Sequence, residues 1–244
     1  MSELLQTALR QGAHALELHL DERQLGLLLD YLALIQKWNQ VYNLTAVRDP
    51  AEMLTHHLLD SLAVIGPLRR QLDIVRPELV EGPETGKGQR PTQPERVKLL
   101  DVGAGAGLPG VVIAICCPDI AVTCVDTVAK KAAFVQQVAV ALKLPNLRGL
   151  HARVESLSDG FDVVSSRAFA SLVDFTNWSR AALTPAGVWL AMKGKQPEDE
   201  LAQLPPDVEV FHVEQLAVPG LGAERCIVWM RPALGAPGSG GGST

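Results

Sequence analysis

One stretch of the chain places an acidic residue and four closely spaced glycines directly after an apolar segment. It reads Leu99-Leu-Asp-Val-Gly-Ala-Gly-Ala-Gly-Leu-Pro-Gly110, and a second apolar run, 111–117, follows at once. A strand, a tight glycine turn and a helix in that order form the part of an open α/β sheet that meets a nucleotide-like ligand. Glycine suits such a turn because it adopts positive φ and lets a ligand approach bare backbone. The spacing therefore predicts a site for a ligand that contains a nucleoside.

Two cofactors fit this turn. Gly105-x-Gly107-x-x-Gly110 matches the dinucleotide fingerprint, so an NAD-dependent oxidoreductase is one interpretation. Asp101, two residues before the first glycine of the turn, favours S-adenosylmethionine (SAM) instead. A carboxylate suits the amino and sulfonium charges of SAM, whereas it would repel a pyrophosphate. Asp126 is placed to accept the ribose hydroxyls of either cofactor. We therefore expect SAM, with Asp101 and Asp126 at the cofactor.

Charged residues also follow other predicted strands. Arg167 comes after an apolar run, at the edge of the sheet where ligands bind, and its guanidinium could pair with a ligand carboxylate or an RNA phosphate. A surface salt bridge is the alternative. Glu155 and Lys193 occupy equivalent places beyond neighbouring strands. A contact to an adenine edge and a solvated helix start explain Glu155 equally well.

Other polar groups give weaker signals. Lys130 and Lys131 add positive charge just after Asp126, although a solvated helix face explains them as well. His56 and His57 are adjacent within a helical pattern, so their side chains point about 100° apart and suit one metal ion poorly. We expect no metal site.

The elements that position these residues alternate between strands and helices, which predicts a mostly parallel, doubly wound sheet. The predicted strands are Lys98–Val102, Ala121–Val125, Leu147–His151, Phe161–Ser165, Val188–Met192, Val208–His212 and Cys226–Met230. The predicted helices between them are Leu108–Cys117, Ala129–Leu142 and Ser171–Ala182. A short connection joins the last two strands, which can therefore pair antiparallel. We expect a Rossmann-like α/β fold whose seven-stranded sheet has an antiparallel last strand, the usual architecture of SAM-dependent methyltransferases.

Three helical patterns precede the glycine turn, at 3–19, 21–41 and 50–65, and the second has Asp21 as its expected N-cap. Together with the predicted strands and the Pro/Gly-rich and Gly/Ser-rich stretches, these patterns divide the chain into four parts. These are an N-terminal helical cap (1–68), a Pro/Gly-rich loop (69–97), a SAM-binding core (98–232) and a Gly/Ser-rich tail (233–244).

Composition narrows the class of protein. Apolar residues make up 47% of the 244 and charged residues 20%, as in soluble enzymes. No apolar run approaches the roughly 18 residues of a membrane span, and no secretory signal is recognisable. The four cysteines form no C-x-x-C pair, so we expect buried thiols in the cytoplasm. A net charge of −5 counts against nucleic-acid binding through bulk charge, so any RNA contact needs a local basic patch.

Several longer strings are more specific than the glycine turn. They are Lys37-Trp-Asn-x-x-Tyr42-Asn-Leu-Thr45-x-Val-Arg-Asp-Pro50, His57-x-Leu-Asp60-Ser61, Ser166-Arg-Ala-Phe-Ala170, and Lys193-Gly194 with Pro197-Glu-Asp-Glu200. Together with the glycine turn they resemble the RsmG/GidB family of bacterial small-subunit ribosomal RNA methyltransferases, which form N7-methylguanosine. The resemblance covers roughly residues 4–230 and leaves out 73–98 and the tail.

The resemblance implies a methyl transfer from SAM to N7 of a guanosine in 16S ribosomal RNA, on the RNA or the small subunit. A monomer is the default expectation. The resemblance also implies SAM contacts at Gly103, Gly105, Gly107, Leu108, Asp126, Val154, Glu155 and Arg167. It implies that the N-terminal helices and the segment 39–45, with Asn39, Tyr42 and Asn43, help form the rim that faces the RNA. We also expect Lys130, Lys131 and Lys193 to face the RNA. Arg167 and Lys193 are expected to position the reactants, without a general base.

Alternatives to this function are a methyltransferase acting on a small molecule or a protein, and a SAM-binding ribosome assembly factor that transfers nothing.

Overall fold

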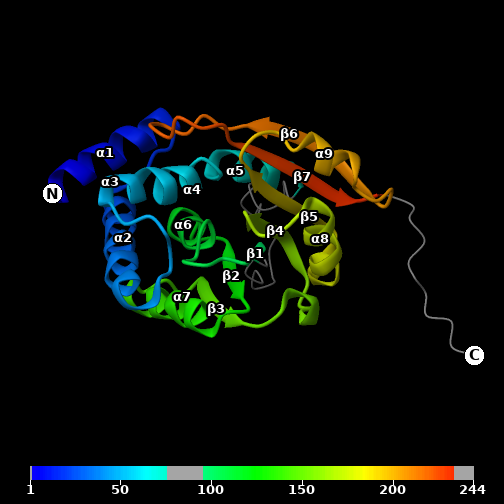
Figure 1. Ribbon diagram of the computed structural model, residues 1–244, viewed down its shortest axis with the longest axis horizontal. Coiled ribbons are helices and arrows are strands. Elements are labelled where there is room, and N and C mark those ends of the chain that lie inside the picture. The colour runs from blue at the N-terminus through cyan, green and yellow to red at the C-terminus, as the bar shows by residue number, and fades with distance from the viewer. Residues whose placement is uncertain (1, 76–95, 234–244) are drawn as a thin grey trace, which may run out of the picture.

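The computed structural model describes residues 2–75 and 96–233, which build one seven-stranded sheet with helices on both faces (Figure 1). The strands are β1 (Lys98–Val102), β2 (Ala121–Asp126), β3 (Leu147–His151), β4 (Phe161–Arg167), β5 (Leu183–Lys193), β6 (Val208–Gln215) and β7 (Cys226–Pro232). Their order across the sheet is β3-β2-β1-β4-β5-β7-β6. The pairs from β3 to β5 are parallel, whereas β7 runs antiparallel to both of its neighbours. The predicted fold class and the antiparallel last strand are thus confirmed.

The N-terminal region is helical, as predicted. It consists of α1 (Ser2–Ala15), α2 (Glu22–Tyr42), α3 (Pro50–Met53), the π-helix η1 (Leu54–Leu59), α4 (Asp60–Leu62) and α5 (Ile65–Val75). Asp21 caps α2 in a capping box with Gln24: the Asp21 carboxylate accepts from the Gln24 N–H at 2.7 Å, and the Gln24 amide oxygen accepts from the Asp21 N–H. The first helix ends four residues before the predicted boundary at 19.

Two further boundaries differ from the expectation. The pattern at 50–65 is not one regular α-helix, because a π-helical turn interrupts it between Met53 and Asp60. Helix α5 continues to Val75, so residues 69–75 belong to a helix and not to the predicted loop. The rest of that loop, apart from 96 and 97, lies outside the described residues, as does the tail from 234.

Successive strand residues alternate between the two faces of the sheet, and each face builds its own core. Leu99 packs in the larger core with the N-terminal helices, α6 (Gly110–Cys116) and α7 (Ala129–Ala141), whereas its neighbour Leu100 packs against α8 (Leu172–Ser179). Figure 1 shows α2 and α6 on one side of the strands and α8 on the other. The remaining short helices are η3 (Val154–Ser156), η4 (Arg180–Ala182) and α9 (Glu198–Ala202).

The cysteines and the helices also bear on the expectations from composition. All four cysteines are unpaired and buried, as predicted. Within 2–75 and 96–233, no helix has the length and apolar character required to cross a membrane.

Candidate functional site

The glycine turn follows β1 at the carboxyl edge of the sheet, and its glycines serve different purposes. Gly103, Gly105 and Gly107 all have positive φ, of 65°, 59° and 91°. A Cβ on Gly105 would meet no atom nearer than 3.9 Å, so this glycine leaves its backbone open to a ligand. A Cβ on Gly107 would come within 2.5 Å of Val111, so Gly107 is required for packing. On Gly103, a Cβ would collide with the ring of Phe169.

Asp101 does not reach a cavity, contrary to the expectation that its carboxylate contacts the cofactor. The side chain is fully buried. One oxygen accepts from the Gly110 N–H at 2.9 Å, at the start of α6, and the other accepts from the Ser165 hydroxyl at 3.0 Å. Burial raises the pKa of Asp101 to about 6. Asp101 thus fastens the turn and α6 to β4 from beneath.

Two adjoining cavities open above the turn, and both are lined by Gly103 and Ala168. The first has a volume of about 440 Å³ and brings together Gly105, Leu108, Arg167 and Lys193 with residues of the N-terminal helices. The second has a volume of about 520 Å³ and is lined by Asp126, Lys131, Val154, Glu155, Phe169 and Trp178, among others. Most residues predicted to contact the cofactor are therefore gathered around two joined spaces.

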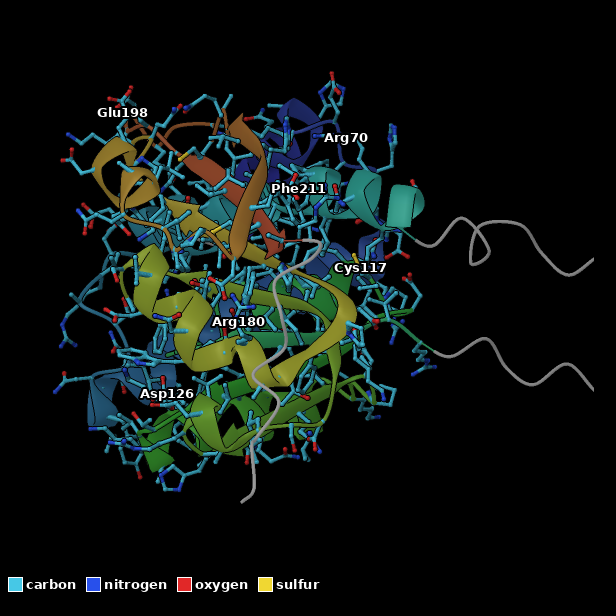
Figure 2. All side chains as sticks on the ribbon, turned by 90° about the vertical axis from the view of Figure 1, so that its right-hand side faces the viewer. Arg70, Cys117, Asp126, Arg180, Glu198 and Phe211 are labelled. Atoms are coloured by element: carbon cyan, nitrogen blue, oxygen red, sulfur yellow. The ribbon has the colours of Figure 1, made fainter. Side chains whose placement is uncertain are left out.

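Asp126 ends β2 at the wall of the second cavity. Its Oδ2 accepts from the Gly105 N–H at 3.0 Å and its Oδ1 from the Val128 N–H at 2.8 Å. These two hydrogen bonds hold the carboxylate in place. Each of its oxygens can accept a further hydrogen bond, so Asp126 is still able to bind a ligand. Lys131 lies 4.0 Å from it, whereas Lys130 is exposed on α7. In Figure 2, Asp126 and Glu198 lie on one side of the molecule, where β2 and β5 end, and Cys117 on the other.

Arg167 is the last residue of β4, two residues beyond the predicted strand end. Its Nη1 donates to the Asp60 carboxylate at 2.8 Å and to the His56 carbonyl at 2.9 Å. The other Asp60 oxygen accepts from Arg225 Nε at 2.9 Å. Asp60 is buried, and both guanidinium groups line the first cavity. One carboxylate between two guanidinium groups leaves a net positive charge at this wall.

Lys193, at the end of β5, also lines the first cavity. Its ammonium group donates to the Ala170 carbonyl at 3.0 Å and to the Glu200 carboxylate at 2.8 Å. Glu200 in turn accepts from the Leu172 N–H at 2.7 Å, at the start of α8. Lys193 therefore joins α9 to α8 at the cavity rim, and a nearby carboxylate balances its charge.

Of the three residues expected to face RNA at the end of α2, Asn39 does not. It is buried, its Oδ1 accepts from the Thr45 N–H at 3.0 Å, and its Nδ2 donates to the Val47 carbonyl at 3.4 Å. Asn39 thus shapes the loop that follows α2. Tyr42 and Asn43 are exposed, as an RNA contact requires.

Sequence reasoning missed several residues of the site. Asp60, His57, Thr45 and Arg225 line the first cavity, and Phe169 and Trp178 line the second. The motif strings contain Thr45, His57, Asp60 and Phe169, which was the available signal. Nothing in the local sequence marks Arg225 or Trp178, because their neighbours in space are distant in the chain. Among the described residues, no three His, Cys, Asp or Glu side chains are grouped to hold a metal ion.

The sequence is similar to those of a known protein family. Residues 24–75 and 88–228 match the family model GidB, described as rRNA small subunit methyltransferase G. Relatives named Ribosomal RNA small subunit methyltransferase G include one from Albidiferax ferrireducens, 67% identical over 93% of this chain and 97% of its own. Another, from Paracidovorax citrulli, is 65% identical over 96% of this chain and 93% of its own. Among solved structures, TrmN from Thermus thermophilus is similar over 56% of this chain and 44% of that chain, with 20% identity and a TM-score of 0.46. The chain belongs to the GidB family of rRNA small subunit methyltransferases.

Proposed function

We propose that this chain transfers the methyl group of SAM to N7 of a guanosine in the 16S ribosomal RNA of the small subunit. The observation that carries the proposal is the pair of cavities that meet at Gly103 and Ala168. One is lined by a fixed carboxylate suited to a ribose, and the other by two arginines. A methyl donor and an RNA base could therefore meet above the glycine turn. The names of the relatives support the choice of substrate.

The second cavity fits the nucleoside half of SAM. Asp126 holds two backbone N–H groups and can accept from ribose hydroxyls as well. Val154 and Glu155 line the same cavity, as do Phe169 and Trp178. Rings and aliphatic groups with few polar anchors are typical of a small-molecule site of this volume. The open backbone at Gly105 would let the methionine half pass into the first cavity.

The proposed chemistry requires no proton transfer to the protein. When bound, SAM supplies an electrophilic methyl group attached to a sulfonium. Guanine N7 carries a lone pair and no hydrogen, so the N–C bond forms as the C–S bond breaks, sulfur keeps the electron pair and the ring becomes cationic. The residues of the first cavity need to hold the two reactants in line. Arg167 is paired with Asp60, and Lys193 is paired with Glu200. Both cations are therefore held in place, as suits groups that position the reactants.

Contacts with RNA are proposed for the positively charged wall of the first cavity and for several residues outside it. Arg167 and Arg225 share a single carboxylate, so the wall is locally positive although the chain is acidic overall. Exposed Tyr42 offers a ring on which an unpaired base can stack, and Lys130 and Lys131 offer partners for phosphates. The substrate would put the reaction in the cytoplasm, and the proposed acting form is a monomer.

The test is transfer of radiolabelled methyl from SAM to unmodified small subunits, deproteinised 16S RNA and a no-RNA control, followed by nucleoside digestion. Recovery of label as N7-methylguanosine supports the proposal. Label in another nucleoside would refute the N7 assignment. Label in protein or in no product, with SAM binding intact by calorimetry, would favour a different substrate or a non-catalytic assembly factor.

The pH profile tests the mechanism separately. Because N7 needs no base, the single-turnover rate should be flat between about pH 6 and 9. A steep pKa in that range that one substitution abolishes would contradict the proposed mechanism.

A further inference from the structure

Thr45 lies at the wall of the first cavity and is held on several sides. Its backbone N–H donates to Asn39 Oδ1 at 3.0 Å. Its hydroxyl oxygen accepts from the Val47 N–H at 3.2 Å and lies 2.9 Å from His57 Nε2. The position of the hydroxyl is therefore fixed, and the direction of its hydrogen depends on which nitrogen of His57 carries a proton.

His57 is 5% exposed, and burial lowers its pKa to about 4, so at neutral pH it is uncharged and has one N–H. Nδ1 is buried and has no hydrogen-bond partner within the described ranges. The carbonyl of the preceding residue, His56, is near the ring and acts to raise the pKa of His57, but it accepts from Arg167 at 2.9 Å and does not meet Nδ1 in hydrogen-bond geometry. A buried N–H without an acceptor is rarer in native proteins than an acceptor without a donor. The proton therefore belongs on Nε2, which donates to Thr45.

This assignment orients the Thr45 hydroxyl. The oxygen has two lone pairs, and the Val47 N–H and the His57 Nε2–H occupy both. Its own hydrogen must be donated elsewhere, and no acceptor for it is found in the part of the chain that the structure describes. Since Thr45 lines the first cavity, the free donor has to be satisfied there, by water or by a substrate.

We propose that Thr45 is a specificity-determining residue whose hydroxyl donates to O6 of the target guanine, with His57 as the positioning residue. The inference rests on the proposed function and adds how the base is selected. O6 is an acceptor beside N7, the proposed methyl acceptor, whereas adenine has an amino donor in that place. A hydroxyl that already has both lone pairs occupied cannot turn to accept from an amino group, so adenine would leave two donors facing each other.

The test compares two bases at the target position. The target guanosine is first located by mapping the radiolabelled methyl group in the wild-type reaction. Small subunits are reconstituted with ligated 16S RNA that carries either guanosine or 2-aminopurine riboside there. 2-Aminopurine keeps N7 and the 2-amino group but lacks O6. We expect Thr45→Val to lower kcat/KM for guanosine by about 10-fold and to leave 2-aminopurine nearly unchanged, so that their ratio falls about 10-fold from the wild-type value. Thr45→Ser, which retains the hydroxyl, should keep the wild-type ratio.

The ratio within one variant does not depend on how much of the protein is folded. If Thr45→Val slowed both substrates equally, Thr45 would be merely structural and the inference would be overturned. A second readout needs no substrate: long-range ¹H–¹⁵N correlation of the free protein should show the His57 proton on Nε2, and a proton on Nδ1 would also overturn the inference. A wild-type protein that methylates no guanosine would instead refute the proposed function, and this inference with it.

Discussion

Arg225 lies 165 residues after Asp60 in the chain, yet its Nε donates to the Asp60 carboxylate at 2.9 Å. The second oxygen of that carboxylate accepts from Arg167, so Asp60 connects the N-terminal helices to β4 and to the residue just before β7. Asp60 is 3% exposed. The Asp60 carboxylate in both ion pairs is therefore shielded from water, and salt screens buried charges much less than exposed ones.

We expect Asp60→Asn to lower the free energy of unfolding by about 2–3 kcal/mol, below the full cost of breaking a buried pair because both guanidinium groups are partly exposed. It should also reduce methyl transfer, since both arginines lose their anchor. Urea unfolding and kcat/KM measure the two effects. Asp207→Asn is the matched control, because Asp207 pairs with Arg180 at a similar distance on the surface and should cost about 0–1 kcal/mol. Equal losses in the two variants would contradict the expectation.

Asp126→Ala should weaken SAM binding by about 10- to 100-fold, since it removes a charged acceptor and frees the Gly105 and Val128 N–H groups. Isothermal calorimetry gives the Kd directly. Asp119→Ala is the control: this exposed acid lies before β2, at the opposite end of the strand from Asp126, and its removal should leave the Kd unchanged. Unaltered binding by Asp126→Ala would remove Asp126 from the proposed cofactor site.

Two glycine substitutions should separate ligand approach from packing. Gly105→Ala should cost about 1–2 kcal/mol of stability because of its positive φ, and its methyl group should block SAM from the open backbone. Gly107→Ala should cost about 3 kcal/mol or more, because the same kind of strain is combined with a clash against Val111. Thermal unfolding with and without SAM distinguishes the two. A stable Gly105→Ala variant that still gains stability from SAM would be inconsistent with this assignment.

Asp101 and His57 should make the free energy of unfolding depend on pH in opposite directions. The pKa of Asp101 is raised from 3.8 to about 6 by burial, so its contribution is present below about pH 4 and lost as the pH rises toward 6. The pKa of His57 is lowered from 6.5 to about 4, again by burial, so its contribution is present above 6.5 and lost as the pH falls toward 4. Each amounts to about 3 kcal/mol, and the two nearly cancel over the same interval.

Single substitutions should reveal the two pH dependences of the free energy of unfolding, which nearly cancel in the wild-type protein. Relative to wild type, Asp101→Asn should become more stable as the pH rises from 4 to 6, and His57→Gln should become less stable. Urea unfolding at several pH values measures both differences, and the double variant should show neither trend. Parallel curves for wild type and both variants would refute these assignments.

The fold could be predicted from the sequence because its determinants are local. Alternating apolar runs marked all seven strands, and Asp21 marked the start of α2. The π-helix at Leu54–Leu59 escaped prediction, since its apolar spacing resembles that of an α-helix. At the site, the glycine turn and Asp126 were found because a strand end places them at the sheet edge. The roles of Asp101 and Asn39 could not be found in this way. A carboxylate or an amide can face a ligand or hold a neighbouring backbone, and only its three-dimensional partners distinguish these roles.

Helix α2 carries two tyrosines with different surroundings. Tyr31, in the middle of the helix, is buried and donates to the Ala106 carbonyl of the glycine turn at 2.6 Å, whereas Tyr42, the last residue of the helix, is exposed. Under the proposed function, one helix thus contacts both the methyl-donor turn and the RNA-facing surface. Any change in SAM affinity that RNA causes through α2 must be matched by an equal change in RNA affinity caused by SAM, because linkage between two binding sites is reciprocal. Measuring either ligand in the presence of the other would therefore report on the same thermodynamic coupling.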